Sequence, residues 1–276
     1  MTIPGYRPYL QLVRIPNTFT ALSNILAAHL IASGGEIRAA ELLGLGAVSA
    51  LLYSGGMVLN DCFDVEEDRR ERPSRPIPSG RVPIKTAWIL GWVLLAAGIA
   101  VAAGVGMKQS IWALLLAGLI VFYDGYAKRT WLGSIAMGAC RYANWGMGLS
   151  IADPGRLTWI LPLAVFVYVA SLTTMSRIEP SGGRRIPILL CGAGVIATGL
   201  LVAGLVAAGF LPHAWPLAPL AVGIGYVLSE LRAAYREPLP DRIQASMKTL
   251  ILGIIPLDAV LAWSGGSWWG GSWCYS

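Results

Sequence analysis

The chain has 276 residues, of which 55% are hydrophobic and 13% are charged, and its mean hydropathy is +0.61. Soluble globular domains carry about 25% charged residues, so this composition excludes an ordinary water-soluble protein. The net charge of +6 comes with arginine-rich connections between apolar segments, which indicates membrane topology and argues against nucleic acid as a partner.

Apolar segments of membrane-spanning length follow one another along the whole chain. Because a helix needs roughly 20 apolar residues to cross a bilayer, we predict an all-α integral membrane protein with nine transmembrane helices in a single domain, residues 1–276. The predicted spans are 15–34, 40–60, 84–106, 109–126, 132–151, 157–177, 185–209, 215–233 and 246–264.

The basic residues predict the orientation of these spans. The connections after the second, fourth, sixth and eighth spans hold 15 of the 21 Lys and Arg residues, whereas the opposite connections hold Arg38, Lys108 and Arg156. Basic residues accumulate on the cytoplasmic side, so we predict a cytoplasmic N-terminus and an external C-terminus in a bacterial inner membrane. Most acidic residues fall on the same side, which predicts a mixed-charge cavity mouth facing the cytoplasm.

An acidic stretch, "NDCFDVEED", directly follows the second span. Asp61, Asp64 and Asp68 are spaced i, i+3, i+7, which places them within one arc of a helix that continues from that span. Clustered hard oxygen ligands favour Mg²⁺, which binds through carboxylates together with substrate phosphates, and Asn60 adds an amide at the rim. The alternative is a solvated acidic helix end without a metal.

The loop that comes next, "RRERPSRPIPSGR", sets prolines between arginines. Proline fixes φ and reduces the freedom of the loop, so Arg72 and Arg75 can be held ready for bidentate pairing with phosphate oxygens. Gly80 permits a turn back into the third span. The alternative is a positive-inside loop with ordinary helix breakers.

Two further polar elements belong to the fourth and fifth spans. "FYDGYAKRTWLG" puts Tyr123, Asp124, Lys128 and Arg129 at the cytoplasmic end of the fourth span, where snorkelling basic side chains are the alternative to substrate contacts. The fifth span, "MGACRYANWGMGLS", carries polar residues one turn apart beside glycines that allow close helix packing. An arginine inside a membrane needs a partner or a ligand, so its polar pair joins the candidate substrate-binding residues: Arg141 and Asn144.

The pattern NDxxDxxxD followed by RPxRPxPSG resembles the UbiA superfamily of intramembrane prenyltransferases. With "LVRIPNTFTALSNILAAHL" at the start, the resemblance covers essentially the whole chain. It implies Mg²⁺-dependent transfer of an isoprenyl group from its diphosphate to an aromatic or other small lipophilic acceptor, in a helical bundle whose pocket opens toward the cytoplasm and toward membrane lipid. It also implies a metal motif (Asp61, Asp64, Asp68) and diphosphate contacts (Arg14, Arg72, Lys128), and we add Asn17, near Arg14, to the substrate-binding residues.

The sixth span departs from the family pattern, which has a second pair of aspartates at its cytoplasmic end. The sequence there is "SLTTMSRIEPSGGRRIP", in which Arg177 and Ser181 occupy the two aspartate positions if Glu179 is the glutamate often found between them. Arg177 removes a metal ligand but supplies a cation that could meet a diphosphate oxygen, so we place it in the catalytic group. Asp124 and Glu179 could restore acidity across the pocket or form structural ion pairs with Lys128 and Arg177.

The combination of YD before a lysine, a CRxxN element and an SRxE element looks like the EboC-like branch of this superfamily. Two other functions remain open from the sequence. A UbiA-type terpene cyclase would capture the allylic cation within the same molecule, and a non-catalytic protein would bind or transport a lipid diphosphate.

Overall fold

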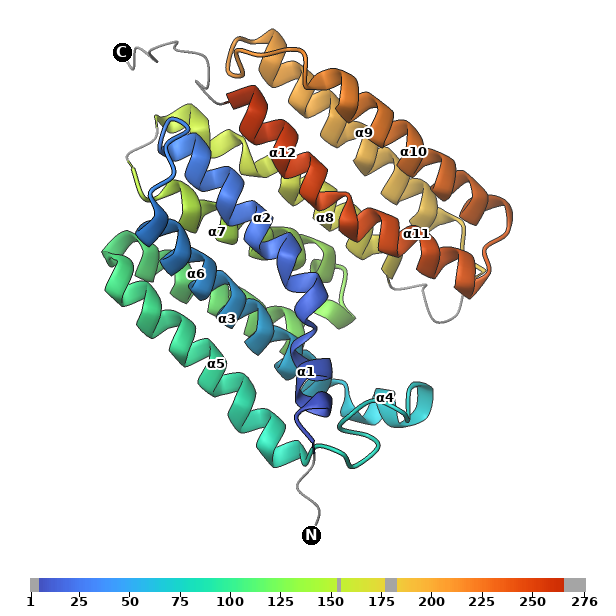
Figure 1. Ribbon diagram of the computed structural model, residues 1–276. Coiled ribbons are helices and arrows are strands. Elements are labelled where there is room, and N and C mark those ends of the chain that lie inside the picture. The colour runs from blue at the N-terminus through green and yellow to red at the C-terminus, as the bar shows by residue number, and fades with distance from the viewer. Residues whose placement is uncertain (1–4, 153–154, 177–182, 266–276) are drawn as a thin grey trace.

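The computed structural model describes residues 5–152, 155–176 and 183–265. All regular structure in these ranges is helical, and the long helices run side by side in one bundle (Figure 1). The short helices α1 (Arg7–Val13) and α4 (Val65–Glu71) lie together at one end, and α12 (Ile254–Gly265) finishes at the other end. The predicted all-α fold class is confirmed.

Each predicted span coincides with a helix or a pair of consecutive helices. In chain order these are α2 (Ile15–Ala32), α3 (Ala39–Phe63), α5 (Ile84–Val105), α6 (Met107–Gly125), α7 (Leu132–Leu149), η2 (Arg156–Ile160) with α8 (Pro162–Ser176), α9 (Ile186–Ala207), α10 (Leu217–Arg236), and α11 (Pro240–Leu252) with α12. A single turn, η1 (Ala127–Arg129), connects α6 to α7.

Seven helical segments in the described ranges are long and apolar enough to cross a membrane. The two predicted spans outside this set are α2 and α7. Both helices carry buried polar side chains, among them Thr20 and Asn24 in α2 and Asn144 in α7. The physical reason is their position inside the bundle, where polar groups meet partners instead of lipid. The number of nine crossings and the orientation therefore remain predictions.

The two polar helices lie between the two large hydrophobic cores. In α7, Trp145 and Leu149 belong to one core, which is built mainly with α8 to α12, whereas Ala143 and Met147 belong to the other, built with α3, α5 and α6. Helix α2 packs against α7, α3 and α12. Large apolar side chains are exposed on the outer helices instead, for example Trp92 in α5, as expected where a helix faces lipid. The site is thus built around the central pair α2 and α7.

Close packing of this central pair depends on Gly148. A Cβ atom there would lie 2.6 Å from the Ala28 Cβ and 3.3 Å from the Ile25 carbonyl oxygen of α2. We expect Gly148→Ala to destabilise the protein by about 1–3 kcal/mol through overpacking. Gly118→Ala in α6 is the matched control because a Cβ there meets nothing within 4 Å. Thermal unfolding in detergent would measure both, and equal melting temperatures would contradict the packing argument.

Candidate active site

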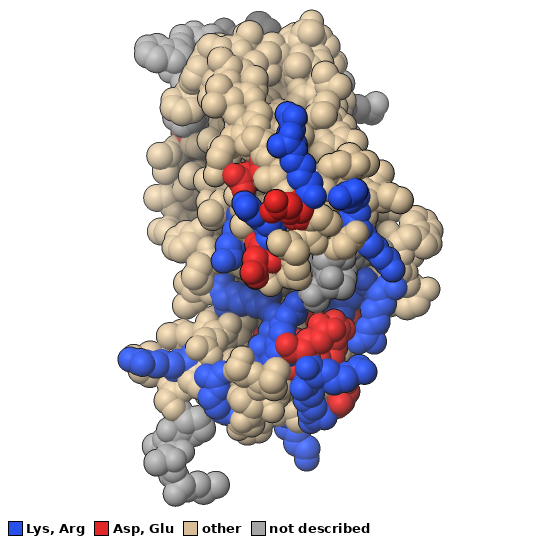
Figure 2. All heavy atoms as spheres, turned by 90° about the vertical axis from the view of Figure 1, so that its right-hand side faces the viewer, with Lys and Arg blue, Asp and Glu red and all other residues tan. Residues whose placement is uncertain are grey.

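Charged side chains gather at one end of the bundle. Figure 2 shows Lys and Arg interleaved with Asp and Glu over the middle and lower parts of the face in view, below an upper part in which neither is seen. The lower end is the one where α1 and α4 lie (Figure 1). This agrees with the predicted mixed-charge mouth, although the side of the membrane that it faces remains a prediction. We call the residues that meet there the charged mouth: Arg14, Asp61, Asp64, Asp68, Arg72, Arg75 and Lys128.

Arginines surround two of the three aspartates. The Asp61 Oδ1 atom lies 2.6 Å from Arg14 Nη2 and 3.3 Å from Arg75 Nη1, and Arg75 Nη1 also lies 2.6 Å from Asp68 Oδ2. Arg72 approaches Asp68 more loosely, at 3.8 Å. Both carboxylates are buried, with exposed fractions of 4% for Asp61 and 1% for Asp68. A buried carboxylate requires a partner of opposite charge, and guanidinium groups serve as these partners.

The backbone at Arg14 is part of this arrangement. Arg14 has φ 48° and ψ 50° and is the residue at which α1 ends and α2 begins. Among the described residues, Arg14 is the one non-glycine residue that has a positive φ. This conformation is uncommon for a residue with a side chain. Strained backbone of this kind is found where the surrounding structure fixes a functional residue. Here the ion pair with Asp61 accompanies the strain.

The proline-rich loop between α4 and α5 is held in place by both apolar and polar contacts. Ile77 and Val82 are buried in a small core together with Leu12 of α1. Arg81 donates to the Ser74 carbonyl oxygen and to Gln11 Oε1, which fastens the loop to α1. Gly80 has φ +74°, so the predicted turn at this glycine is confirmed. These contacts tie the loop that carries Arg75 to α1; that its arginines are held for phosphate stays a prediction.

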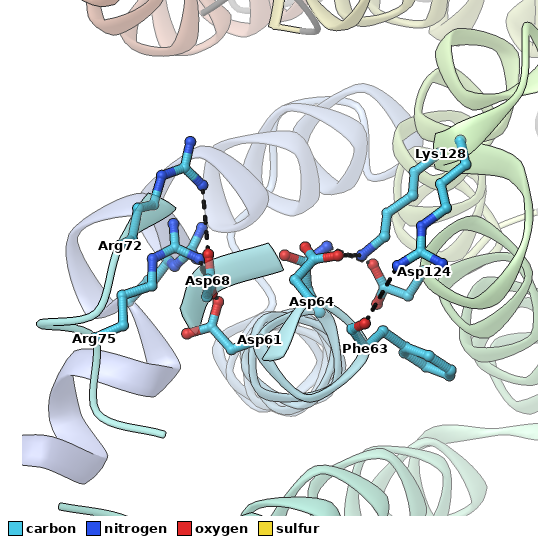
Figure 3. A network of polar contacts seen from close by, with 11 residues as sticks. Asp61, Phe63, Asp64, Asp68, Arg72, Arg75, Asp124 and Lys128 are labelled. Atoms are coloured by element: carbon cyan, nitrogen blue, oxygen red, sulfur yellow. Dashed lines mark hydrogen bonds and ion pairs between the residues drawn. The ribbon is translucent and has the colours of Figure 1, made fainter. Parts of the chain in front are cut away.

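Asp64 points away from the other two aspartates, which corrects the prediction of one shared arc. Helix α3 ends at Phe63 and α4 begins at Val65, so Asp64 is the cap residue at a break. Figure 3 shows Asp61 and Asp68 on the side of the arginines and Asp64 on the opposite side, toward Asp124 and Lys128. The Asp64 Oδ1 atom lies 2.6 Å from Lys128 Nζ. The break in the helix is the physical reason, since spacing along one unbroken helix would have kept the three together.

Two of the three aspartates have the geometry of a Mg²⁺ site. Within the described ranges, no three His, Cys, Asp or Glu side chains converge on one point. However, Asp61 Oδ1 and Asp68 Oδ2 both lie within hydrogen-bond distance of the same cationic atom, Arg75 Nη1. This atom shows where a cation bridges the two carboxylates, and the donors are the hard oxygens that Mg²⁺ prefers. The pair Asp61 and Asp68 therefore fits a divalent ion, whereas Asp64 does not join them in this structure.

A cavity lies near the charged mouth, inside the bundle between α2, α3, α6 and α7. Its empty volume, which includes space open to solvent, is about 540 Å³. Asn60, next to Asp61, donates a 2.7 Å hydrogen bond to Asp124 Oδ1, and Asp124 lines the cavity. This contact joins the mouth to the cavity. The lining residues, which define what we call the central cavity, are Ala21, Ser49, Tyr53, Gly56, Met57, Leu116, Ile120, Tyr123, Asp124, Met137, Cys140, Arg141 and Asn144.

The predicted polar pair of α7 lies at this cavity. Asn144 accepts a 2.8 Å hydrogen bond from Ser49 and donates a 2.9 Å hydrogen bond to the Ala21 carbonyl oxygen, so its role is to join α7 to α3 and α2. Arg141 donates to Thr20 Oγ1 at 2.8 Å and to Asn24 Oδ1 at 3.2 Å.

Three other predicted site residues have distinct positions. Asn17 lies in the first turns of α2, where its carbonyl oxygen accepts a hydrogen bond from the Thr20 hydroxyl. Arg129 is exposed and donates to the Phe63 carbonyl oxygen at 3.4 Å. Tyr123 lines the central cavity next to Asp124. The predicted residues of the sixth span lie outside the described ranges: Arg177 and Glu179.

Sequence reasoning assigned no role to one buried polar network. Asp258 of α12 is 1% exposed and accepts hydrogen bonds from Ser23, from Asn24 at 2.9 and 2.7 Å, and from Trp145 Nε1 at 3.0 Å. Because Asn24 also accepts from Arg141, this network reaches the wall of the central cavity. The signal was present in the sequence, since Ser23, Asn24 and Asp258 are polar residues inside apolar segments.

Comparisons with known proteins agree with this geometry. The model of the UbiA prenyltransferase family matches residues 21–252. A digeranylgeranylglyceryl phosphate synthase from Metallosphaera sedula is 33% identical over 180 residues, which are 64% of this chain and 63% of that protein. The enzyme of the same name from Methanoculleus marisnigri is 30% identical over 92% of this chain and 96% of its own length. These relatives are archaeal, so a bacterial inner membrane remains a prediction, as does the EboC-like branch.

Solved structures share the fold. The structure of a digeranylgeranylglyceryl phosphate synthase superposes with a TM-score of 0.70 and 21% identity, covering 94% of this chain and 98% of that one. A UbiA homolog from Archaeoglobus fulgidus bound to GPP and Mg²⁺ gives a TM-score of 0.61 and 15% identity, covering 92% of this chain and 99% of the other. With the fold shared and the family model matching most of the chain, this protein belongs to the UbiA prenyltransferase family.

Proposed function

We propose that this protein transfers an isoprenyl group from an isoprenyl diphosphate to a small lipophilic acceptor at the membrane, in a Mg²⁺-dependent reaction. The observation that carries the proposal is that the charged mouth and the central cavity are neighbours, because Asn60, next to Asp61, donates to Asp124 in the cavity wall. An isoprenyl diphosphate has the same two parts, a highly charged head and an apolar chain. The head would bind at the mouth and the chain would lie among the apolar side chains of the cavity.

Residues of the mouth have separate tasks in this proposal. Asp61 and Asp68 would hold Mg²⁺, with Asp64 completing the set if the break between α3 and α4 rearranges. When bound, Mg²⁺ neutralises negative charge on the leaving diphosphate. Arg14 and Arg75, now paired with the aspartates, would instead meet phosphate oxygens, as bidentate guanidinium groups do. Arg72, which lies 3.8 Å from Asp68, and Arg129, which follows Lys128 in the chain, would be further phosphate contacts.

The reaction itself requires little covalent chemistry from the protein. The C1–oxygen bond of the isoprenyl diphosphate breaks and the electron pair leaves with the diphosphate. The acceptor oxygen forms a new bond to C1 and gives up its proton, which the departing diphosphate can accept. Lys128, which is 11% exposed in its side chain and lies against Asp64, would stabilise charge on the leaving group. Arg177 and Glu179 stay in this proposal as residues that could complete the pocket from the sixth span.

The acceptor is not expected to be aromatic. The related synthases carry the name digeranylgeranylglyceryl phosphate synthase, which favours an acceptor of the glyceryl phosphate type over an aromatic ring. Structures of a family member bound to GPP and to DMAPP with Mg²⁺ support the diphosphate donor and the metal.

The test is product analysis by mass spectrometry with the purified protein, Mg²⁺, a panel of isoprenyl diphosphates and candidate acceptors. We expect a prenylated acceptor that disappears when EDTA replaces Mg²⁺ and returns when Mg²⁺ is restored. Cyclised hydrocarbon without any acceptor would point to a terpene cyclase. Diphosphate binding without turnover over the whole panel would point to a binding or transport protein, and either outcome would refute the proposal.

A further inference from the structure

Arg141 carries a positive charge deeper in the bundle than the charged mouth, where the diphosphate of the isoprenyl donor would bind. Arg141 lies over the ring of Tyr53, with 5.6 Å between its guanidinium carbon and the ring centroid. Tyr53 and Asp61 are eight residues apart in helix α3, which corresponds to about 12 Å along the helix axis. A second cationic position therefore exists well inside the bundle from the charged mouth.

The direct partners of Arg141 carry no negative charge. They are the Thr20 hydroxyl, the Asn24 amide oxygen and the Tyr53 ring. No described carboxylate lies within ion-pair distance of Arg141. A guanidinium in the apolar interior is costly unless an opposite charge approaches it. Two hydrogen bonds also leave some of its five N–H donors available, and Arg141 is part of the wall of the central cavity.

Asp258 stabilises this arrangement from behind through Asn24. The Asn24 amide donates to both Asp258 oxygens and its own oxygen accepts from Arg141, so the amide has one permitted orientation. Trp145 and Ser23 fix Asp258 in turn. The negative charge of Asp258 partly offsets the positive charge of Arg141, with Asn24 between them. The network also holds the guanidinium at the cavity wall.

We infer that Arg141 is the binding site for an anionic group of the acceptor, and that Asn24 and Asp258 are the residues that position it. This inference rests on the proposed transferase function. It places the two substrates with their charged groups at opposite ends of the central cavity, the diphosphate at the mouth and the acceptor's anion at Arg141. The reacting end of the acceptor then faces C1 of the isoprenyl chain near Asp124.

The first experiment measures binding alone, without isoprenyl diphosphate or Mg²⁺. The probes are a monoalkylglycerol phosphate and the monoalkylglycerol with the same chain, added to protein in non-ionic detergent. We expect the phosphate to raise the melting temperature more than the alcohol does, and Arg141→Gln to remove this difference. Arg185→Gln is the matched control, because Arg185 also lies over a tyrosine ring, that of Tyr235 at 5.5 Å, but is not part of the central cavity. A difference that persists in Arg141→Gln would overturn the inference.

The second experiment measures transfer to the same two probes. We expect the ratio of kcat/KM for the phosphate to that for the alcohol to fall by roughly tenfold or more in Arg141→Gln, and Arg141→Lys to recover part of it. Asp258→Asn should lower the ratio less, since it keeps the shape of the network but removes its charge. A merely structural Arg141 would change the melting temperature and both rates together and leave the ratio unchanged, which would refute the assignment.

The two experiments separate this inference from the function on which it rests. If wild-type protein binds the phosphate through Arg141 but transfers nothing to either probe, the anion site stands and the transferase proposal fails. If transfer occurs equally to both probes, the transferase proposal stands and the anion site fails.

Discussion

Asp61→Asn is expected to lower the rate of isoprenyl transfer by roughly a hundredfold or more and to raise the Mg²⁺ concentration needed for half-maximal activity. The substitution keeps the size of the side chain but removes one of the two carboxylates that share Arg75. Because metal binding and stabilisation of the leaving diphosphate both depend on this charge, the loss should be of the size seen for a transition-state contact. Steady-state rates over a Mg²⁺ titration measure both quantities.

Glu66→Gln is the matched control for this prediction. Glu66 lies in the same acidic segment but is exposed and pairs with Arg69 on the solvent side of α4. We expect its rate and its Mg²⁺ requirement to match those of the wild type. Asp61→Asn should still fold, since Arg75 keeps its 2.6 Å contact with Asp68, and a melting curve checks this. A folded Asp61→Asn protein with wild-type rate and Mg²⁺ requirement would exclude Asp61 as a metal ligand.

Lys128→Met is the second substitution with a large expected effect, a fall in rate of roughly a hundredfold. The methionine retains the apolar stem but removes the ammonium group that lies 2.6 Å from Asp64. In the wild-type protein this ammonium group would contact the leaving diphosphate. We therefore expect Lys128→Met to raise the KM for the isoprenyl diphosphate as well as to lower kcat. Initial rates over a range of diphosphate concentrations separate these two effects.

Lys85→Met is the control for Lys128, because Lys85 is an exposed lysine near the start of α5, outside the charged mouth. It should behave as the wild type. If Lys128→Met kept its rate and KM, Lys128 would be a snorkelling residue at the helix end, the alternative that the sequence offered.

The ion pairs of the charged mouth suggest how the same residues can stay paired both without substrate and with Mg²⁺ and a diphosphate bound. In the structure, Asp61 and Asp68 are neutralised by Arg14 and Arg75. Arrival of Mg²⁺ and a diphosphate would supply the aspartates with a cation and the arginines with an anion. Buried charges would remain paired in both states, which is the condition for keeping so many of them beneath a membrane.

The sequence by itself determined the class of the protein, the positions of its helices and the composition of the charged mouth. Apolar segments of about 20 residues leave few alternatives to helices in a bilayer, because every backbone polar group must be paired within the segment. The motif from Asn60 to Gly80 was also readable, since carboxylates, prolines and arginines at that spacing have a direct chemical meaning. These features depend on residues close to one another in the chain.

Only the tertiary structure decided which polar side chains pair with one another. The break at Asp64 turned that side chain toward Lys128, and no pattern of spacing shows where a helix will break. Likewise, Arg141 and Asp258 are 117 residues apart in the chain, and their connection through Asn24 depends on α2, α7 and α12 packing together. Contacts between helices that are far apart in the chain decide which partner each buried charge meets. Such contacts cannot be read from the spacing of residues and become visible only in the folded structure.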